Sequence, residues 1–273
     1  MTGTAAHRTS GDTFAANRAT GRIALTLAPG KNARRRVHES GSLRVRFPNT
    51  TTVPEAVIVN TGGGMTGGDR FDIEIRLEES AALVAGTVAA EKVYRSTGDD
   101  AVVNVQLSVG PNARLAWLPQ ATILFNAARL SRRIDVDIGA GGALVMAEAV
   151  VFGRTAMGEV VHDGSWRDRW RVRIGGRLAF AENVRLDGAI ADKLAHRAVA
   201  SGGCAVATLL IVPGDDSVSD RFRATEFTGE AAISVWNGLA VARFCAAEGA
   251  MLRRDLMHAL AALGQAVPRL WLQ

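Results

Sequence analysis

The sequence has little lysine and cysteine. Only three of its 32 Lys and Arg residues are lysines, at positions 31, 92 and 193, a bias typical of arginine-rich coding in a GC-rich genome. The two cysteines, Cys204 and Cys245, lie far apart and form neither a CxxC pair nor a disulfide framework. This pattern favours a reducing compartment, and we expect a cytoplasmic protein.

Long apolar runs and the common catalytic motifs are also missing. The longest uncharged run, residues 198–214, is shorter than the ~20 apolar residues of a membrane span and contains Pro213 and several glycines. The N-terminus lacks the apolar segment of a secretory signal. No HExxH or GxSxG motif occurs, and the five histidines are scattered. The sequence therefore predicts no membrane span, no secretory signal and no preformed metal or serine-hydrolase site.

Apolar residues, by contrast, are plentiful. The chain has 273 residues, of which 48% are hydrophobic and 22% charged, enough to form a substantial core. The net charge of +5 is uneven, because residues 1–60 contain nine Lys and Arg against three Asp and Glu. The remaining chain is close to neutral and shows no basic stretch interleaved with aromatics, so nucleic-acid binding is not expected. We interpret residues 1–20 as a flexible polar tail, residues 21–273 as one domain, and residues 34–36, all arginine, as a solvated or partner-facing arm.

Alternation with a period of two is the prevailing pattern. Apolar and polar residues alternate in 71–77, 103–109 and 134–138, as in strands with one buried face. Each run ends in a turn, at 79–83, 110–115 and 139–144, and this spacing of about 30 residues is typical of stacked repeats. Gly175-Gly176 and Asn237-Gly238 indicate two hairpins. The sequence therefore predicts a mainly β, layered fold, either β-helix-like or built from two sheets.

Helical patterns are scarce. Residues 248–263 carry leucines in a helical stripe, followed by Gly264 as a stop signal. A weaker pattern covers 187–200. We expect about two helices, both toward the C-terminal third.

The densest glycine cluster is Asn60-Thr-Gly-Gly-Gly-Met-Thr-Gly-Gly-Asp69, which formally matches GxGxxG. A dinucleotide site requires a helix directly after the glycines, but a strand pattern follows here, so that interpretation is rejected. The glycines instead favour a tight crossover between strands, with Asp69 bonding to backbone amides, or a surface that meets another backbone. Both alternatives remain open at this point.

Three further segments stand out, two of which contain charged residues. Residues 91–96 bring Glu91, Lys92 and Arg95 together with the only tyrosine, and these charges either pair with one another or line a cavity or partner surface. Pro119 interrupts an apolar run, which indicates a strand edge or bulge. Residues 152–159 read as a turn containing an ion pair between Arg154 and Glu159.

In order along the chain, five segments resemble the urease accessory protein UreD family. They are NTGGGMTGGDR (60–70), AAEKVYRS (89–96), WLPQATILF (117–125), FGRTAMGE (152–159) and PRLW (268–271). The resemblance covers about residues 40–273. It implies a non-enzymatic scaffold with a mainly β, layered fold that binds apo-urease and joins the accessory proteins UreF and the GTPase UreG. It also implies that nickel reaches the urease active site through this complex, with no cofactor bound tightly by the chain itself.

The same resemblance marks candidate residues for partner contact or nickel passage. Two departures from the family pattern stand out: Ala121 replaces the usual glutamate after Pro-Gln, and Gly86-Thr87-Val88 replaces a threonine-rich run containing glutamine. A path that depends on that carboxylate is therefore in question, and we assign no catalytic residue and no nickel ligand. The candidates are Gly63, Gly64, Gly67, Gly68, Asp69, Glu91, Lys92, Tyr94, Arg95, Gln120, Gly153, Arg154 and Glu159.

A carbohydrate-active enzyme on a β-solenoid is the alternative hypothesis. It would use Asp69 with Glu91 or Glu159, and retaining hydrolysis would need two carboxylates about 5 Å apart. Pairing of these carboxylates with Arg95 or Arg154 would exclude it.

Overall fold

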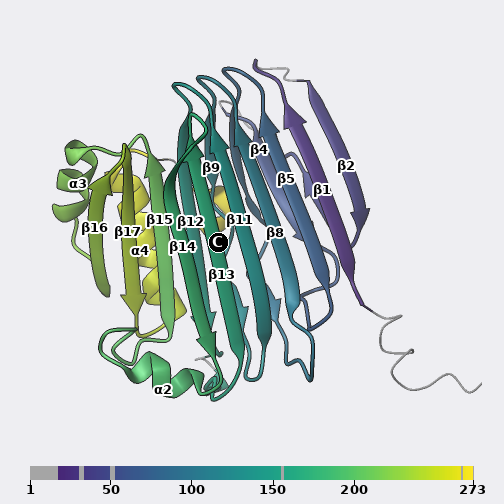
Figure 1. Ribbon diagram of the computed structural model, residues 1–273, viewed down its shortest axis with the longest axis vertical. Helices are drawn as coiled ribbons and strands as arrows, with labels where there is room; N and C mark the ends of the chain where they lie inside the picture. The colour runs from purple at the N-terminus through teal and green to yellow at the C-terminus, as the bar shows by residue number, and fades with distance from the viewer. Residues whose placement is uncertain (1–17, 31–33, 50–52, 155–156, 266, 273) are drawn as a thin grey trace, which may run out of the picture.

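Two facing β-sheets form the body of the protein, and helices pack behind one of them (Figure 1). The computed structural model describes residues 18–30, 34–49, 53–154, 157–265 and 267–272. Residues 1–17, most of the predicted polar tail, lie outside this part of the chain, and β1 begins at Thr20. The expected mainly β, layered fold is confirmed.

The seven-stranded sheet has the order β14-β13-β11-β8-β5-β1-β2. Its strands are β1 (Thr20–Leu27), β2 (Arg35–Gly41), β5 (Arg70–Leu77), β8 (Ala101–Val109), β11 (Arg129–Ile138), β13 (Ser165–Ile174) and β14 (Arg177–Asp187).

The ten-stranded sheet has the order β16-β17-β15-β12-β9-β6-β4-β3, and β7 and β10 form a short extension beside β12. Its strands are β3 (Leu43–Arg46), β4 (Glu55–Asn60), β6 (Ala82–Thr87), β7 (Glu91–Val93), β9 (Arg114–Trp117), β10 (Thr122–Leu124), β12 (Ala143–Phe152), β15 (Ala205–Val212), β16 (Glu230–Trp236) and β17 (Leu239–Ala246).

The central strands form the coils of a β-solenoid. β5, β8, β11 and β13 pair in parallel in one sheet, and β4, β6, β9 and β12 do so in the other. The turns between the sheets stack directly, since the Ser80 N–H donates to the Pro111 carbonyl and the Asn112 N–H to the Ala140 carbonyl, both at 2.9 Å. The predicted repeat of about 30 residues is therefore one solenoid coil.

Apolar side chains fill two layers. The larger core lies between the sheets and receives the inward residues of each alternating strand, such as Ile75, Leu107 and Ile134. The second lies between the ten-stranded sheet and the helices α3 (Asp216–Arg223) and α4 (Gly249–Ala262). Strand β12 is buried on both faces, which explains its nearly continuous apolar sequence.

Both predicted hairpins are confirmed, with β13–β14 and β16–β17 joined at Gly175-Gly176 and Asn237-Gly238. The helix predicted at 248–263 is α4. The one predicted at 187–200 is shorter, and α2 spans only Ile190–Ala195. At its start, Asp187 belongs to β14 and pairs with Ser165 of β13. At its end, His196 has an extended backbone conformation and residues 197–200 form a turn.

Helix α3 was not predicted, although Asp215 caps it by accepting a 3.0 Å hydrogen bond from the Val218 N–H. A short 3-10 helix, η2, spans Arg269–Trp271. Over the described ranges, no helix combines the length and the apolar character needed to cross a membrane.

Candidate functional site

The described residues of the five family-like segments meet at the end of the solenoid opposite the stacked turns, a region we call the motif end (residues 60–70, 89–96, 117–125, 152–154, 157–159 and 268–271). The Met65 N–H donates to the Lys92 carbonyl, and the Tyr94 N–H donates to the Met65 carbonyl, both at 2.8 Å. In the next coils, β7 pairs with β10 and β10 with β12. Segments from successive coils thus form one continuous structure.

The glycine loop packs tightly against the following coil. A Cβ atom on Gly67 would lie 1.9 Å from Ser96 Oγ and 2.1 Å from the Asp99 carbonyl oxygen. One on Gly64 would lie 2.5 Å from the Tyr94 ring. The glycines are therefore needed for close approach, and the backbone they meet belongs to this same chain.

Asp69 closes this crossover. Its carboxylate accepts hydrogen bonds of 2.8 Å from the backbone N–H groups of Thr66 and Ala19. The side chain is buried, at 6% exposure. The predicted bonding of Asp69 to backbone amides is confirmed, and both of its oxygens are engaged in holding the loop and the start of β1.

Glu91 faces the same loop. Its carboxylate accepts a 2.9 Å hydrogen bond from the Asn60 amide, which also donates to the Gly64 carbonyl at 3.0 Å. Burial raises the pKa of Glu91, and the hydrogen bond from Asn60 offsets this rise only in part. In the described part of the chain, Glu91, Lys92 and Arg95 form no ion pairs with one another, so the interpretation that they pair mutually is wrong; Lys92 and Arg95 are exposed.

An aromatic and charged group lies beside Glu91. The Tyr94 and Phe125 rings meet edge to face at 5.0 Å, and the Arg154 guanidinium lies 4.5 Å from the Phe125 ring centre. Arg154 Nε donates to Glu159 at 2.7 Å, which confirms the predicted ion pair. Burial alone would raise the pKa of Glu159, but hydrogen bonds from Arg154 and Asn126 outweigh it and lower the pKa.

The C-terminal segment docks on residues 118–120. Gln120 Nε2 donates to the Leu270 carbonyl at 2.7 Å, and Trp271 Nε1 donates to the Leu118 carbonyl at 3.2 Å. Pro119 lies in the interruption between β9 and β10, where the sequence predicted an edge or bulge.

A mainly apolar groove of about 510 Å³ runs between this region and α4. Ala121 lines it together with Ile123, Val151, Leu252 and Met157. Ala121, where the resemblance led us to expect a glutamate, is thus part of the apolar lining of this groove.

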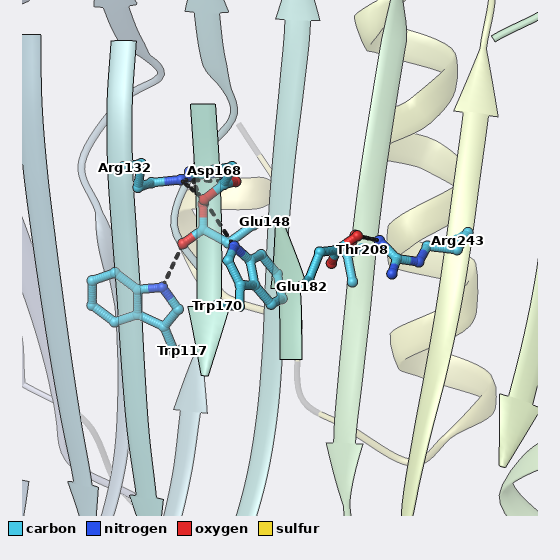
Figure 2. Close-up of polar contacts among 8 residues, drawn as sticks. All are labelled: Trp117, Arg132, Glu148, Asp168, Trp170, Glu182, Thr208 and Arg243. Carbon is cyan, nitrogen blue, oxygen red and sulfur yellow. Dashed lines mark hydrogen bonds and ion pairs between the residues drawn. The ribbon is translucent and has the colours of Figure 1, made fainter. Parts of the chain in front are cut away.

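A second polar group, which we call the buried ion cluster, lies between the sheets (Figure 2). Arg132 of β11 donates from Nε to both oxygens of Asp168 on β13, at 3.1 Å each, and a further guanidinium nitrogen also contacts Asp168. Its remaining nitrogen donates to Glu148 of β12. Trp117 Nε1 donates to Glu148 at 2.7 Å, and Trp170 Nε1 to Asp168 at 2.9 Å. One arginine is therefore held by two carboxylates, each of which also receives an indole N–H.

Burial is the largest single influence on the pKa of both Arg132 and Glu148. It would lower the pKa of Arg132, but the charges of Asp168 and Glu148 outweigh it and raise that pKa, so the guanidinium stays charged. Burial also raises the pKa of Glu148, and Arg132 and Trp117 offset this only in part.

The cluster lines a cavity of about 480 Å³ between the sheets. Toward β16 and β17, Glu182 and Arg243 form a 2.6 Å ion pair, and Arg243 also donates to Thr208 at 2.7 Å (Figure 2). Arg243 is the more exposed partner, at 46% against 15% for Glu182. The ion pair thus lies between the buried cluster and solvent.

Sequence reasoning missed the buried ion cluster, although two signals were present. Arg132 and Asp168 occupy inward positions of alternating strands, between Leu130 and Ile134 and between Trp166 and Trp170. Glu148 interrupts the apolar run of β12. A charge at an inward position is the pattern that marks a buried ion pair.

Metal-ligating side chains are not clustered in this structure. Among the described residues, no three His, Cys, Asp or Glu side chains are placed together so as to hold a metal ion.

Comparison with known proteins agrees with the five-segment resemblance. The family model described as UreD urease accessory protein matches residues 17–272. The chain is 53% identical to "Urease accessory protein UreD" of Rhodopseudomonas palustris (strain BisA53), covering 95% of this chain and 92% of that protein. It is 53% identical to the protein of the same name from Bradyrhizobium diazoefficiens, covering 95% and 96%. The alternative of a carbohydrate-active enzyme is therefore wrong, as the Arg154–Glu159 pair also indicates, and the role is accessory rather than catalytic. This chain belongs to the UreD urease accessory protein family.

Proposed function

We propose that this protein is a non-enzymatic cytoplasmic scaffold for urease maturation. In this role it binds the apo-urease subunits together with the accessory proteins UreF and UreG, so that nickel is delivered to the urease active site. Family membership supports a role in urease maturation. The convergence of the five family-like segments at the motif end is the observation that carries the finer proposal.

The surface of the motif end has the chemistry of a protein interface. Half of the large hydrophobic side chains exposed in the described residues lie within or next to its segments: Val88, Tyr94, Met157, Val160 and Leu272. Methionine, arginine and aromatic residues are enriched at protein interfaces. Here they adjoin an apolar groove that a partner's side chains can fill.

The segments are also built to present a fixed surface. Backbone hydrogen bonds join the glycine loop to residues 92–95, and Asp69 ties that loop to β1. A preorganised surface loses little conformational entropy on binding, which favours affinity. This rigidity suits a scaffold that positions several partners.

Glu91 is a carboxylate at a position that lowers the stability of the protein, and we attribute its presence there to function. Its pKa is raised by burial, so the ionised carboxylate is disfavoured where it lies. A carboxylate retained at such a position is expected to contact a partner or the cation in transit. We propose this role for Glu91 within the motif end.

Nickel is cargo for such a scaffold rather than a resident cofactor. A carrier that passes Ni²⁺ onward must release it, so single oxygen or imidazole contacts suit it better than a closed His and Cys site. The carboxylates that line the cavity already have partners, since Arg132 holds Glu148 and Asp168 and Arg243 pairs with Glu182, so we assign no nickel ligand among them.

Co-expression with the urease structural subunits and the other accessory proteins tests the proposal. The wild-type chain should co-purify with urease, and its deletion should leave urease that is synthesised but poor in nickel by elemental analysis. Normal nickel content after deletion, together with no recovered complex, would exclude the function.

A surface variant locates the interface. The double substitution Met157→Glu and Val160→Glu changes residues that are 73% and 51% exposed, so the fold should persist. It should lower both co-purified urease and nickel content at least about tenfold, since a charge must be desolvated in an apolar contact. Val37→Glu on β2, 42% exposed, is the matched control and should behave as wild type. Equal behaviour of the two variants would rule out the motif end as the interface.

A further inference from the structure

Strand β13 presents a row of arginines on the outer face of the seven-stranded sheet. Its inward residues, from Trp166 to Val172, are buried, whereas Arg167, Arg169, Arg171 and Arg173 point outward. Alternate residues on a strand are separated by about 7 Å, so the four guanidinium groups span roughly 20 Å. In Figure 1 this face is not covered by α3 or α4, which lie behind the other sheet.

The neighbouring strands place further arginines in register with this row. Arg185 of β14 lies opposite Arg167, and Arg133 of β11 lies beside Arg169. Like charges at adjacent cross-strand positions are destabilising, so this arrangement is unfavourable for the isolated sheet. We call these six residues the arginine stripe: Arg133, Arg167, Arg169, Arg171, Arg173 and Arg185.

Carboxylates neutralise only part of the stripe. Arg167 pairs with Asp100 at 3.2 Å and Asp187 at 3.4 Å, and Arg133 and Arg185 each have a carboxylate partner. Asp135 and Asp137 of β11 lie beside Arg171 and Arg173 in register, without an ion pair to either. Within the described residues, the side chains of Arg169 and Arg173 have neither a hydrogen bond nor an ion pair.

On the other half of the same sheet face, the arginines of β1 and β5 have carboxylate partners. On β1 and β5, Arg22 and Arg76 both pair with Glu74 at 3.7 Å, and Arg70 pairs with Asp72 at 3.2 Å. Each of these three arginines has a carboxylate partner, although Arg22 and Arg76 share Glu74. Among the described residues, Arg169 and Arg173 of the stripe have no such partner, in a part of the chain whose overall charge is near neutral.

We propose that the arginine stripe is a docking surface for an acidic face of a protein partner in the urease maturation complex. This inference rests on the proposed function and adds a second contact surface, separate from the motif end. Separated carboxylates on such a partner would meet Arg169 and Arg173 and relieve the repulsion along the stripe. A protein fits better than a nucleic acid, because Asp100, Asp135 and Asp187 would repel a continuous phosphate backbone. The tryptophans of β13 also face inward and offer no stacking surface.

Charge reversal tests the stripe. Arg169→Glu with Arg173→Glu should reduce recovery of the co-expressed complex at least about tenfold at low salt. Wild-type recovery should fall as NaCl is raised from about 50 to about 300 mM, since exposed charges are screened. The double variant should have lost most of this salt dependence. Its melting temperature should stay close to that of wild type, because the carboxylate introduced at position 169 would lie beside Arg133 and the one introduced at position 173 beside Asp137, two opposite effects.

The matched control lies on the same sheet face. Arg22→Glu with Arg76→Glu makes the same change in charge at residues 58% and 57% exposed, and should leave recovery within twofold of wild type. Equal loss in both double variants, or no loss in the stripe variant, overturns the inference while leaving the proposed function intact. Stripe-dependent binding of a DNA duplex of about 30 base pairs at about 150 mM salt would overturn the choice of a protein partner. Failure of the wild-type chain to form any complex would instead count against the proposed function.

Discussion

The buried ion cluster and the motif end both hold carboxylates against arginine, but in opposite environments. Arg132 and Glu148 are each 5% exposed, whereas Arg154 is 45% and Glu159 19% exposed. Inside the protein, each charge depends on its partners because water is not available to replace them. At the surface, water replaces a lost partner, so the pair contributes little to folding. The comparison separates polar groups that the fold requires from polar groups that are available for binding.

The largest expected effect is that of Arg132→Leu. It leaves Glu148 and Asp168 buried without their cation, which should destabilise the protein by about 3–5 kcal/mol in urea unfolding. Arg133→Leu, the next residue and 53% exposed, is the control and should change stability by less than about 1 kcal/mol. Similar losses for both variants would contradict the assignment of the cluster to the fold.

The folding stability of Arg132→Leu should depend on pH in a defined way. Burial raises the pKa of Glu148, and without Arg132 that pKa should lie further above its unfolded value. The folded state then binds this proton more tightly than the unfolded state, so the stability of the variant should decrease as pH rises through the unfolded and then the folded pKa. Relative to wild type, Arg132→Leu should therefore recover stability as pH is lowered toward about 4.

Trp117→Phe should have the next largest effect. It removes the N–H that donates to Glu148 at 2.7 Å, a bond to a buried charged group, and should destabilise by about 1.5–3 kcal/mol. Trp271→Phe removes a 3.2 Å bond to a neutral carbonyl and should cost about 1 kcal/mol for that bond. Chemical denaturation gives the loss of stability of each variant. A larger loss for Trp271→Phe than for Trp117→Phe would show that Glu148 does not depend on the Trp117 N–H.

Glu91→Gln tests a carboxylate of the motif end. It should leave the stability unchanged or raise it, whereas the substitutions in the buried ion cluster lower it. Since burial raises the folded pKa of Glu91, its ionisation opposes folding, and this penalty grows as pH rises through the unfolded and then the folded pKa. Glutamine retains an oxygen for the Asn60 amide and does not titrate. The variant should be equally or more stable near neutral pH, with the difference vanishing at acid pH, in thermal melts across the acid-to-neutral range.

The function of Glu91→Gln in urease maturation should nevertheless be impaired. Nickel content of co-expressed urease should fall despite the retained stability. Asn60→Asp, which also alters this hydrogen bond but adds a second carboxylate, serves as the comparison. Loss of stability together with loss of nickel would indicate that Glu91 acts only through the fold.

The smallest expected effect on stability is that of Arg154→Ala. An exposed ion pair and a contact with the Phe125 ring together contribute about 1 kcal/mol, and less at high salt. The lowered pKa of Glu159 means that this contribution is present above the unfolded pKa and is lost as pH falls through the folded value. Denaturation of Arg154→Ala at low and high salt measures this contribution. A loss of stability above about 3 kcal/mol would show that the fold requires the Arg154–Glu159 pair, as it requires the buried ion cluster.

Much of the fold could be predicted because its signals are local. Period-two alternation at 71–77 and 103–109, and turns at a spacing of one coil, predicted the stacked strands. The helix at 187–200 was overestimated because Asp187 pairs with β13, a contact distant in sequence, and because the backbone becomes extended at His196. The site was predicted as separate segments, and only the resemblance to a family joined them.

Sequence alone determined the period of the strands, the turns, helix α4 and the Arg154–Glu159 pair, since each depends on residues close along the chain. Tertiary structure alone decided that Arg132 donates to Glu148 and Asp168. It also decided that Gln120 donates to the Leu270 carbonyl and that arginines of three strands form one stripe. These contacts follow from the register of the sheets and the stacking of coils. Register depends on the packing of all strands together, and no single segment encodes it.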